Sequence, residues 1–161
     1  MRQDTGDKSF PIHDTTIPSF PLEYDRKSFV HALGLFSIAP LGARVFLRIG
    51  QIETAEEIAR TVLVEAKKVT DHIKAHRIIG IIAMRRGDAA AAEASFAAAM
   101  DMAQERNLPL LELTLARDLK YFVLEGLGRG DEAELLIDVA IKQMSKPKEE
   151  FDEVLGAVRE W

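Results

Sequence analysis

Cysteine is absent from the 161 residues, which excludes disulfide bonds, thiolate catalysis and cysteine-ligated zinc. Aromatic residues make up only 7%, with a single tryptophan, Trp161. No long hydrophobic run is present, because the uncharged stretch over residues 29–43 is too short to span a bilayer and contains Pro40. The N-terminal residues also lack the apolar stretch of a secretory signal. We therefore expect a protein of the cytoplasm or of another reducing, soluble compartment, without membrane insertion.

Positive charge is not in excess, since the formal net charge is −5. An acidic chain of this kind is not expected to bind nucleic acid or anionic lipid. Its apolar fraction of 47% and charged fraction of 29% are ordinary for a globular protein. The length fits one domain with a substantial core.

A loose internal repeat is the clearest pattern that is present. A glycine is followed by an alanine five residues later at three places, and successive glycines lie 37 and 41 residues apart: Gly50 and Ala55, Gly87 and Ala92, Gly128 and Ala133. A period of this size, built from a helix, a tight turn and a second helix, predicts a helical solenoid.

Apolar residues with helical spacing predict an all-α fold of about seven helices over residues 25–161. Thr70 or Asp71 is expected to cap the helix that ends near Arg86, and Asn107 with Pro109 to begin another. Residues 1–24 contain three prolines and are expected to be an extended arm, either a free tail or docked on the domain. The expected helices cover residues 26–38, 40–49, 53–69, 71–86, 89–105, 109–127 and 132–144, with a capping helix at 147–161.

The unit around Gly87 alternates large and small residues at fixed positions: Ile79, Gly80, Gly87, Asp88, Ala92, Phe96 and Ala99. Small residues let two helices approach closely, and Phe96 fills the gap to the neighbouring unit. This set resembles the tetratricopeptide repeat. The resemblance implies a right-handed superhelix of helix pairs whose concave face binds peptides or protein segments.

The flanking units resemble the motif less closely. In the unit around Gly128, Ala133, Ile137 and Ala140 fit the motif, but Tyr121 or Lys120 stands where a small residue belongs. In the unit around Gly50, Ala59 stands where a large residue belongs. The period is also longer than the usual tetratricopeptide length. In this respect the chain resembles the extended repeats in the sensory regions of large ATP-dependent bacterial transcription activators.

Two histidines, His72 and His76, lie four residues apart and so share one helix face. Such spacing suits a metal site, but no third ligand is near in the sequence, and packing within the fold is the favoured interpretation. No glycine-rich loop precedes a Lys-Ser or Lys-Thr pair, so no phosphate cradle is expected. We expect neither a metal nor a cofactor.

Five cations form the candidate binding site. The tetratricopeptide register places them on the concave side of the first helix of two units, while many carboxylates fall on the second helices; the alternative is that they are ordinary solvated side chains. These cations are Arg44, Arg48, Lys74, Arg77 and Arg85.

The function expected from these patterns is protein interaction. We expect a module, scaffold or assembly subunit that binds an acidic peptide or protein segment on its concave face. The alternative is a helical-repeat domain that senses a small molecule for a signalling or transcription-regulating protein. An enzyme is not expected, because no nucleophile–base pair or metal set emerges.

Overall fold

The computed structural model describes residues 38–156 and is all-helical over that range, without a strand. The arm expected at residues 1–24, most of the helix expected at 26–38, and residues 157–161 lie outside the described residues. The described α-helices are α2 (Ala39–Arg48), α3 (Ile52–Glu65), α4 (Val69–Arg85), α5 (Ala89–Glu105), α6 (Pro109–Leu119), α7 (Gly130–Met144) and α8 (Asp152–Gly156). A π-helical turn, η1 (Lys120–Leu124), extends α6, and a 3-10 turn, η2 (Lys148–Phe151), precedes α8.

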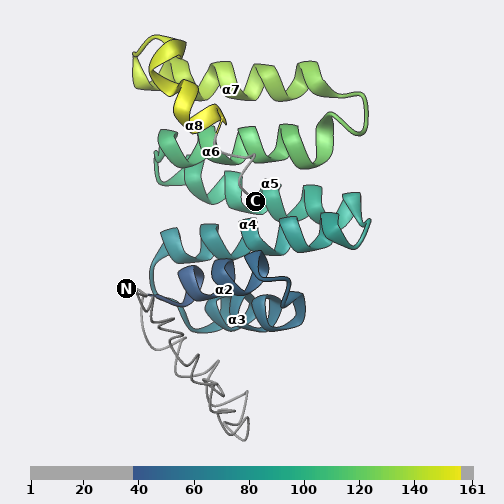
Figure 1. Cartoon of the computed structure of the whole chain (residues 1–161). Helices are drawn as coiled ribbons and strands as arrows, with labels where there is room; N and C mark the ends of the chain where they lie inside the picture. The colour runs from purple at the N-terminus through teal and green to yellow at the C-terminus, as the bar shows by residue number, and fades with distance from the viewer. Residues whose placement is uncertain (1–37, 157–161) are drawn as a thin grey trace, which may run out of the picture.

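The helices α4, α5, α6 and α7 are stacked in chain order, with α2 and α3 together beyond α4 at one end and α7 at the other (Figure 1). Each packs against the next, and α2 also packs against α4. One buried apolar cluster runs through all of these contacts. Alanine contributes to it on nearly every helix, which lets neighbouring backbones approach closely. In this part of the chain, no helix has the length and apolar character that crossing a bilayer requires.

Four helices end in the same left-handed turn. Gly50, Gly87 and Gly128 have φ values of 81°, 79° and 69°, and Asn107 has 52°. In each case the amide of the following residue donates to the carbonyl five positions back, at 2.8–2.9 Å. This is the Schellman arrangement, which satisfies carbonyl groups left open at a helix end. The glycines that mark the repeat in the sequence are therefore the helix-ending residues of α2, α4 and η1.

Two expected caps are wrong. Asn107 ends α5 rather than beginning α6, because asparagine tolerates the left-handed conformation that this turn requires. Neither Thr70 nor Asp71 caps α4, which begins earlier, at Val69, with Lys68 at the N-cap position. Asp71 instead lies inside the first turn, where a carboxylate is stabilised by the helix dipole.

The α4–α5 pair is organised around Gly80 and Phe96. An ideal Cβ built on Gly80 would lie 2.9 Å from Cε2 of Phe96, so the missing side chain makes room for the aromatic ring. Phe96 has no exposed surface, nor do Ala92 and Ala99 on the same helix. On its other side Phe96 stacks on Phe122 of η1, with ring centroids 6.4 Å apart. The ring of Phe96 thus contacts α4, the first helix of its own unit, and η1 of the unit that follows.

The other residues expected at packing positions differ in burial. On α7, Ala133, Ile137 and Ala140 are buried, with at most 3% of their surface exposed. Ile79 on α4 is half-buried and packs at the edge of the core. The helix α7 packs against α6 and against η1.

Of the capping helix expected at 147–161, the structure describes residues 147–156. Ser145 adopts a left-handed conformation that ends α7, and the chain then forms η2 and the short α8. The helix α8 packs against α6, and Phe151 at the end of η2 is buried. Lys148 of η2 holds this segment to α7 through Glu134, at 3.3 Å, and Asp138, at 3.2 Å.

Candidate interaction surface

Three of the five predicted cations line one hollow between α2 and α4. We call it the basic hollow; it has a volume of about 180 Å³, and its described lining consists of Pro40, Leu41, Arg44, Lys74, Arg77 and Ile78. The side chains of Arg44 and Lys74 are exposed, and Arg77 is half-buried. The lining therefore combines three cations with an apolar floor.

The other two predicted cations lie elsewhere on the same helices. Arg85 donates from Nη1 to the carbonyl of Leu47, at 2.8 Å, where a cation complements the negative end of α2. Because α4 rises about 1.5 Å per residue, Arg85 lies about 12 Å along the helix from Arg77. Arg48 is exposed in the last turn of α2 and does not line the hollow. These contacts show that α2 and α4 run in the same direction, with their C-terminal ends together.

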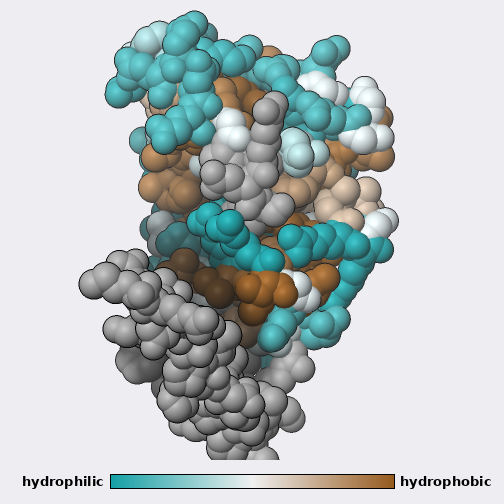
Figure 2. All heavy atoms as spheres, in the orientation of Figure 1, coloured by the Kyte–Doolittle hydropathy of each residue, from teal (hydrophilic) through white to brown (hydrophobic). Residues whose placement is uncertain are grey.

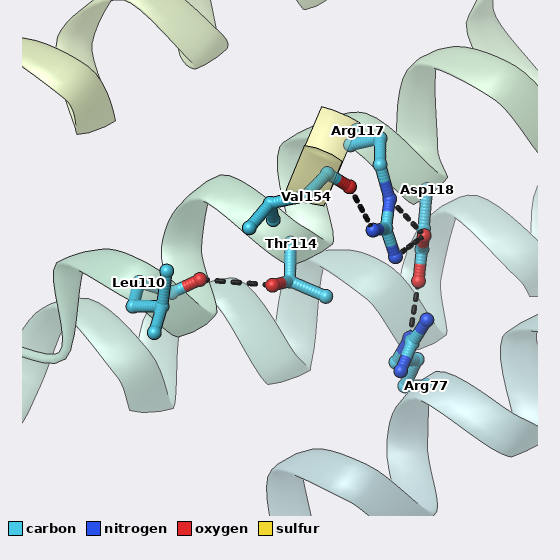
Figure 3. A network of polar contacts seen from close by, with 6 residues as sticks. All are labelled: Arg77, Leu110, Thr114, Arg117, Asp118 and Val154. Atoms are coloured by element: carbon cyan, nitrogen blue, oxygen red, sulfur yellow. Dashed lines mark hydrogen bonds and ion pairs between the residues drawn. The ribbon is translucent and has the colours of Figure 1, made fainter. Parts of the chain in front are cut away.

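A buried carboxylate lies behind the basic hollow. Asp118 of α6 has no exposed surface and forms an ion pair with Nε of Arg77 on α4 (Figure 3). Its Oδ1 also accepts from Nε and Nη2 of Arg117, at 2.9 and 2.7 Å. Arg117 in turn donates from Nη1 to the carbonyl of Val154 on α8. This network, Arg77–Asp118–Arg117–Val154, joins α4, α6 and α8.

The network was not anticipated from the sequence. Its signal was an Arg-Asp pair, Arg117 and Asp118, inside a helix whose neighbouring residues Leu115, Ala116 and Leu119 are apolar. Charged residues at core positions are almost always paired, so that pattern indicates a buried partner on another helix. Arg77 on α4 is that partner of Asp118. It therefore lines the basic hollow and also takes part in an ion pair inside the core.

A row of exposed apolar side chains runs along α2 beside the basic hollow. Ile38, Leu41, Val45 and Ile49 are each 49–62% exposed, and their spacing places them along one side of the helix. Figure 2 shows hydrophobic surface over the region of α2, next to hydrophilic surface over α4. Leu41 belongs to both the row and the hollow.

The helix α3, which follows α2 in the chain, carries mainly negative side chains, in contrast to the basic hollow. An open hollow of about 510 Å³ lies along it, and its described lining includes Glu53, Glu56, Glu57 and Glu65. Glu56 accepts from Nε of Arg60, at 2.9 Å, and pairs with Arg86 of α4, at 2.6 Å. The hydrogen bond from Arg60, and then that from Arg86, hold the pKa of Glu56 below its ordinary value, against the opposing effect of burial.

The surroundings of the two histidines of α4 agree with packing within the fold. Nε2 of His72 donates to the carbonyl of Ala66, at 2.8 Å, just beyond the end of α3. Burial, with the neighbouring His72 as a second cause, lowers the pKa of His76 below its ordinary value. Over residues 38–156, no three histidine, aspartate or glutamate side chains are grouped so as to hold a metal ion.

Comparison with protein-family models, with curated proteins and with solved structures yields no match to this chain.

Proposed function

We propose that the chain is a tetratricopeptide-like interaction module, a right-handed solenoid of helix pairs that binds an acidic peptide or protein segment at the basic hollow. The architecture is supported by the close approach of α4 and α5 at Gly80 and Phe96. It is also supported by the left-handed helix ends that recur at Gly50, Gly87 and Gly128.

The observation that carries the binding role is the convergence of Arg44, Lys74 and Arg77 on one hollow, in a chain whose net charge is −5. Two carboxylates lie close by: Asp71, 3.9 Å from Lys74, and the buried Asp118, which also pairs with Arg117. Among the residues that the structure describes, the three cations outnumber these two carboxylates. A carboxylate from a partner forms charge-assisted hydrogen bonds with guanidinium and ammonium groups, so an acidic segment suits this surface.

Volume favours a peptide over a small molecule as the ligand. The basic hollow, at about 180 Å³, is smaller than the roughly 300–1,000 Å³ typical of pockets for drug-sized ligands. It suits one side chain of a longer segment that continues over the surface. Four of the seven described residues of the larger hollow are glutamates, and all seven lie on α3, whereas ligand pockets are lined mainly by hydrophobic and aromatic side chains.

The test is a titration of a short, fluorescein-labelled peptide rich in Asp and Glu, followed by fluorescence anisotropy. The double variant Arg44→Gln/Lys74→Gln removes two exposed cations of the hollow. The matched control, Arg106→Gln/Lys142→Gln, removes the same charges at exposed positions on the α5–α6 connection and on α7.

We expect the hollow variant to bind about 2- to 30-fold more weakly than the control, from ~0.2–1 kcal/mol for each exposed ion pair. Binding by the unmodified protein should also weaken as salt is raised. The proposal is wrong if the unmodified protein does not bind the acidic peptide, or if the two double variants bind it equally.

A further inference from the structure

The basic hollow is lined by apolar as well as cationic side chains, which is more than an acidic ligand alone requires. Its apolar part comes from Pro40 and Leu41 at the start of α2 and from Ile78 on α4. Its cations lie one turn away on the same helices: Arg44 follows Pro40 by four residues, and Lys74 precedes Ile78 by four. Both helices thus present an apolar contact next to a charged one.

The size of the hollow sets what fits the apolar part. A volume of about 180 Å³ accommodates one large side chain. Ile78 and Pro40 are buried, whereas Leu41 is 60% exposed, so an inserted side chain would rest on a fixed floor and be covered by Leu41. Aromatic side chains gain most from such contacts, because they bury a large area and also interact with neighbouring cations.

We propose that the basic hollow is a specificity subsite that recognises a large apolar residue, preferably aromatic, two positions from an acidic residue in an extended partner segment. This rests on the proposed function and names the feature of the acidic segment that is recognised. In an extended chain, residues two apart point to the same side and lie about 6.6 Å apart. That separation is close to the roughly 6 Å that a helix rises over four residues, which is the spacing from Pro40 to Arg44 on α2 and from Lys74 to Ile78 on α4.

The test uses four labelled peptides with identical acidic flanks and central triplets Glu-Ser-Trp, Gln-Ser-Trp, Glu-Ser-Ala and Gln-Ser-Ala. Unmodified protein is expected to bind the Trp peptides about tenfold more tightly than the matched Ala peptides, as for partial burial of one aromatic side chain. It should also prefer Glu over Gln at the first position of the triplet.

Two single variants separate these preferences. Leu41→Ser should reduce the Trp-over-Ala preference to about threefold and leave the Glu-over-Gln preference unchanged. Arg44→Gln should lower the Glu-over-Gln preference more than the Trp-over-Ala preference, which it reduces only through the lost cation–aromatic contact. The matched control Val45→Ser removes an exposed apolar side chain of α2 that does not line the hollow, and it should change neither preference.

The outcomes distinguish the two proposals. If acidic peptides bind but the Trp and Ala peptides bind equally, the subsite is refuted and the acidic-segment function stands. An equal effect of Leu41→Ser and Val45→Ser would also refute the subsite, since it would place the apolar contact along the row on α2 rather than in the hollow. If no acidic peptide binds, the proposed function fails and the subsite fails with it.

Discussion

Replacing Gly80 tests the packing of the α4–α5 pair most directly. A Cβ at this position would lie 2.9 Å from Cε2 and 3.1 Å from Cδ2 and Cζ of Phe96, whose ring is fully buried. Overpacking of this kind costs about 1–3 kcal/mol, whereas alanine regains about 1 kcal/mol of helix propensity over glycine. We therefore expect Gly80→Ala to lower the free energy of unfolding by about 0–2 kcal/mol, and Gly80→Leu by about 3 kcal/mol.

The decisive measurement is a double-mutant cycle by urea denaturation, followed by far-ultraviolet circular dichroism. Phe96→Ala alone should cost about 3–5 kcal/mol. In the Gly80→Leu background it should cost about 1–3 kcal/mol less, because the leucine occupies the space that the ring leaves. Gly130→Ala, where a Cβ has no neighbour within 4 Å, is the control and should be additive with Phe96→Ala. Additivity of the Gly80 and Phe96 substitutions within about 0.5 kcal/mol would refute the packing argument.

Three further substitutions test separate parts of the fold. Asp118→Ala should lower the free energy of unfolding by about 3–5 kcal/mol, because it leaves the guanidinium groups beside it without their carboxylate; a loss below about 1 kcal/mol in urea denaturation would contradict a structural role for the network. Gly87→Ala should cost about 1–2 kcal/mol, since its Cβ has open space but its φ of 79° is unfavourable for alanine; equal denaturation midpoints would argue against the left-handed turn. For His76, the lowered folded-state pKa means that protonation favours unfolding, so stability present above the unfolded pKa of about 6.5 declines as the pH falls below it. His76→Gln should therefore lose less stability than the unmodified protein between about pH 7.5 and about pH 5.5, and equal losses would contradict this.

The helical class was predictable from the sequence because the evidence for it is local. Apolar spacing and alanine content determine which segments become helices, and glycine is the residue best suited to a left-handed end. Gly50, Gly87 and Gly128 therefore marked helix ends correctly. Asn107 was misassigned because asparagine favours both the start and the end of a helix, and the choice depends on which neighbouring turn it joins.

The candidate site was less predictable because it depends on which helices face each other. The pattern of charges brought Arg44, Lys74 and Arg77 into consideration, but nothing local separates them from Arg85, which binds the end of α2 instead. The π-helical turn at η1 was also missed, since the expected helix ran through it without a break. Its wider winding coincides with the stacking of Phe122 on Phe96, a contact between residues 26 positions apart.

The network around Asp118 has a consequence for how the molecule unfolds. In a stack where most contacts join adjacent helices, each end is free to open without the rest, and protection from hydrogen exchange falls towards the ends. Asp118 connects α4 with α6, and Arg117 extends the connection to the main chain of α8. Opening α8 removes the hydrogen bond from Arg117 to Val154 and so weakens the network around Asp118, which also holds α4 to α6. We therefore expect α4, α6 and α8 to open together, with amides that exchange with similar free energies.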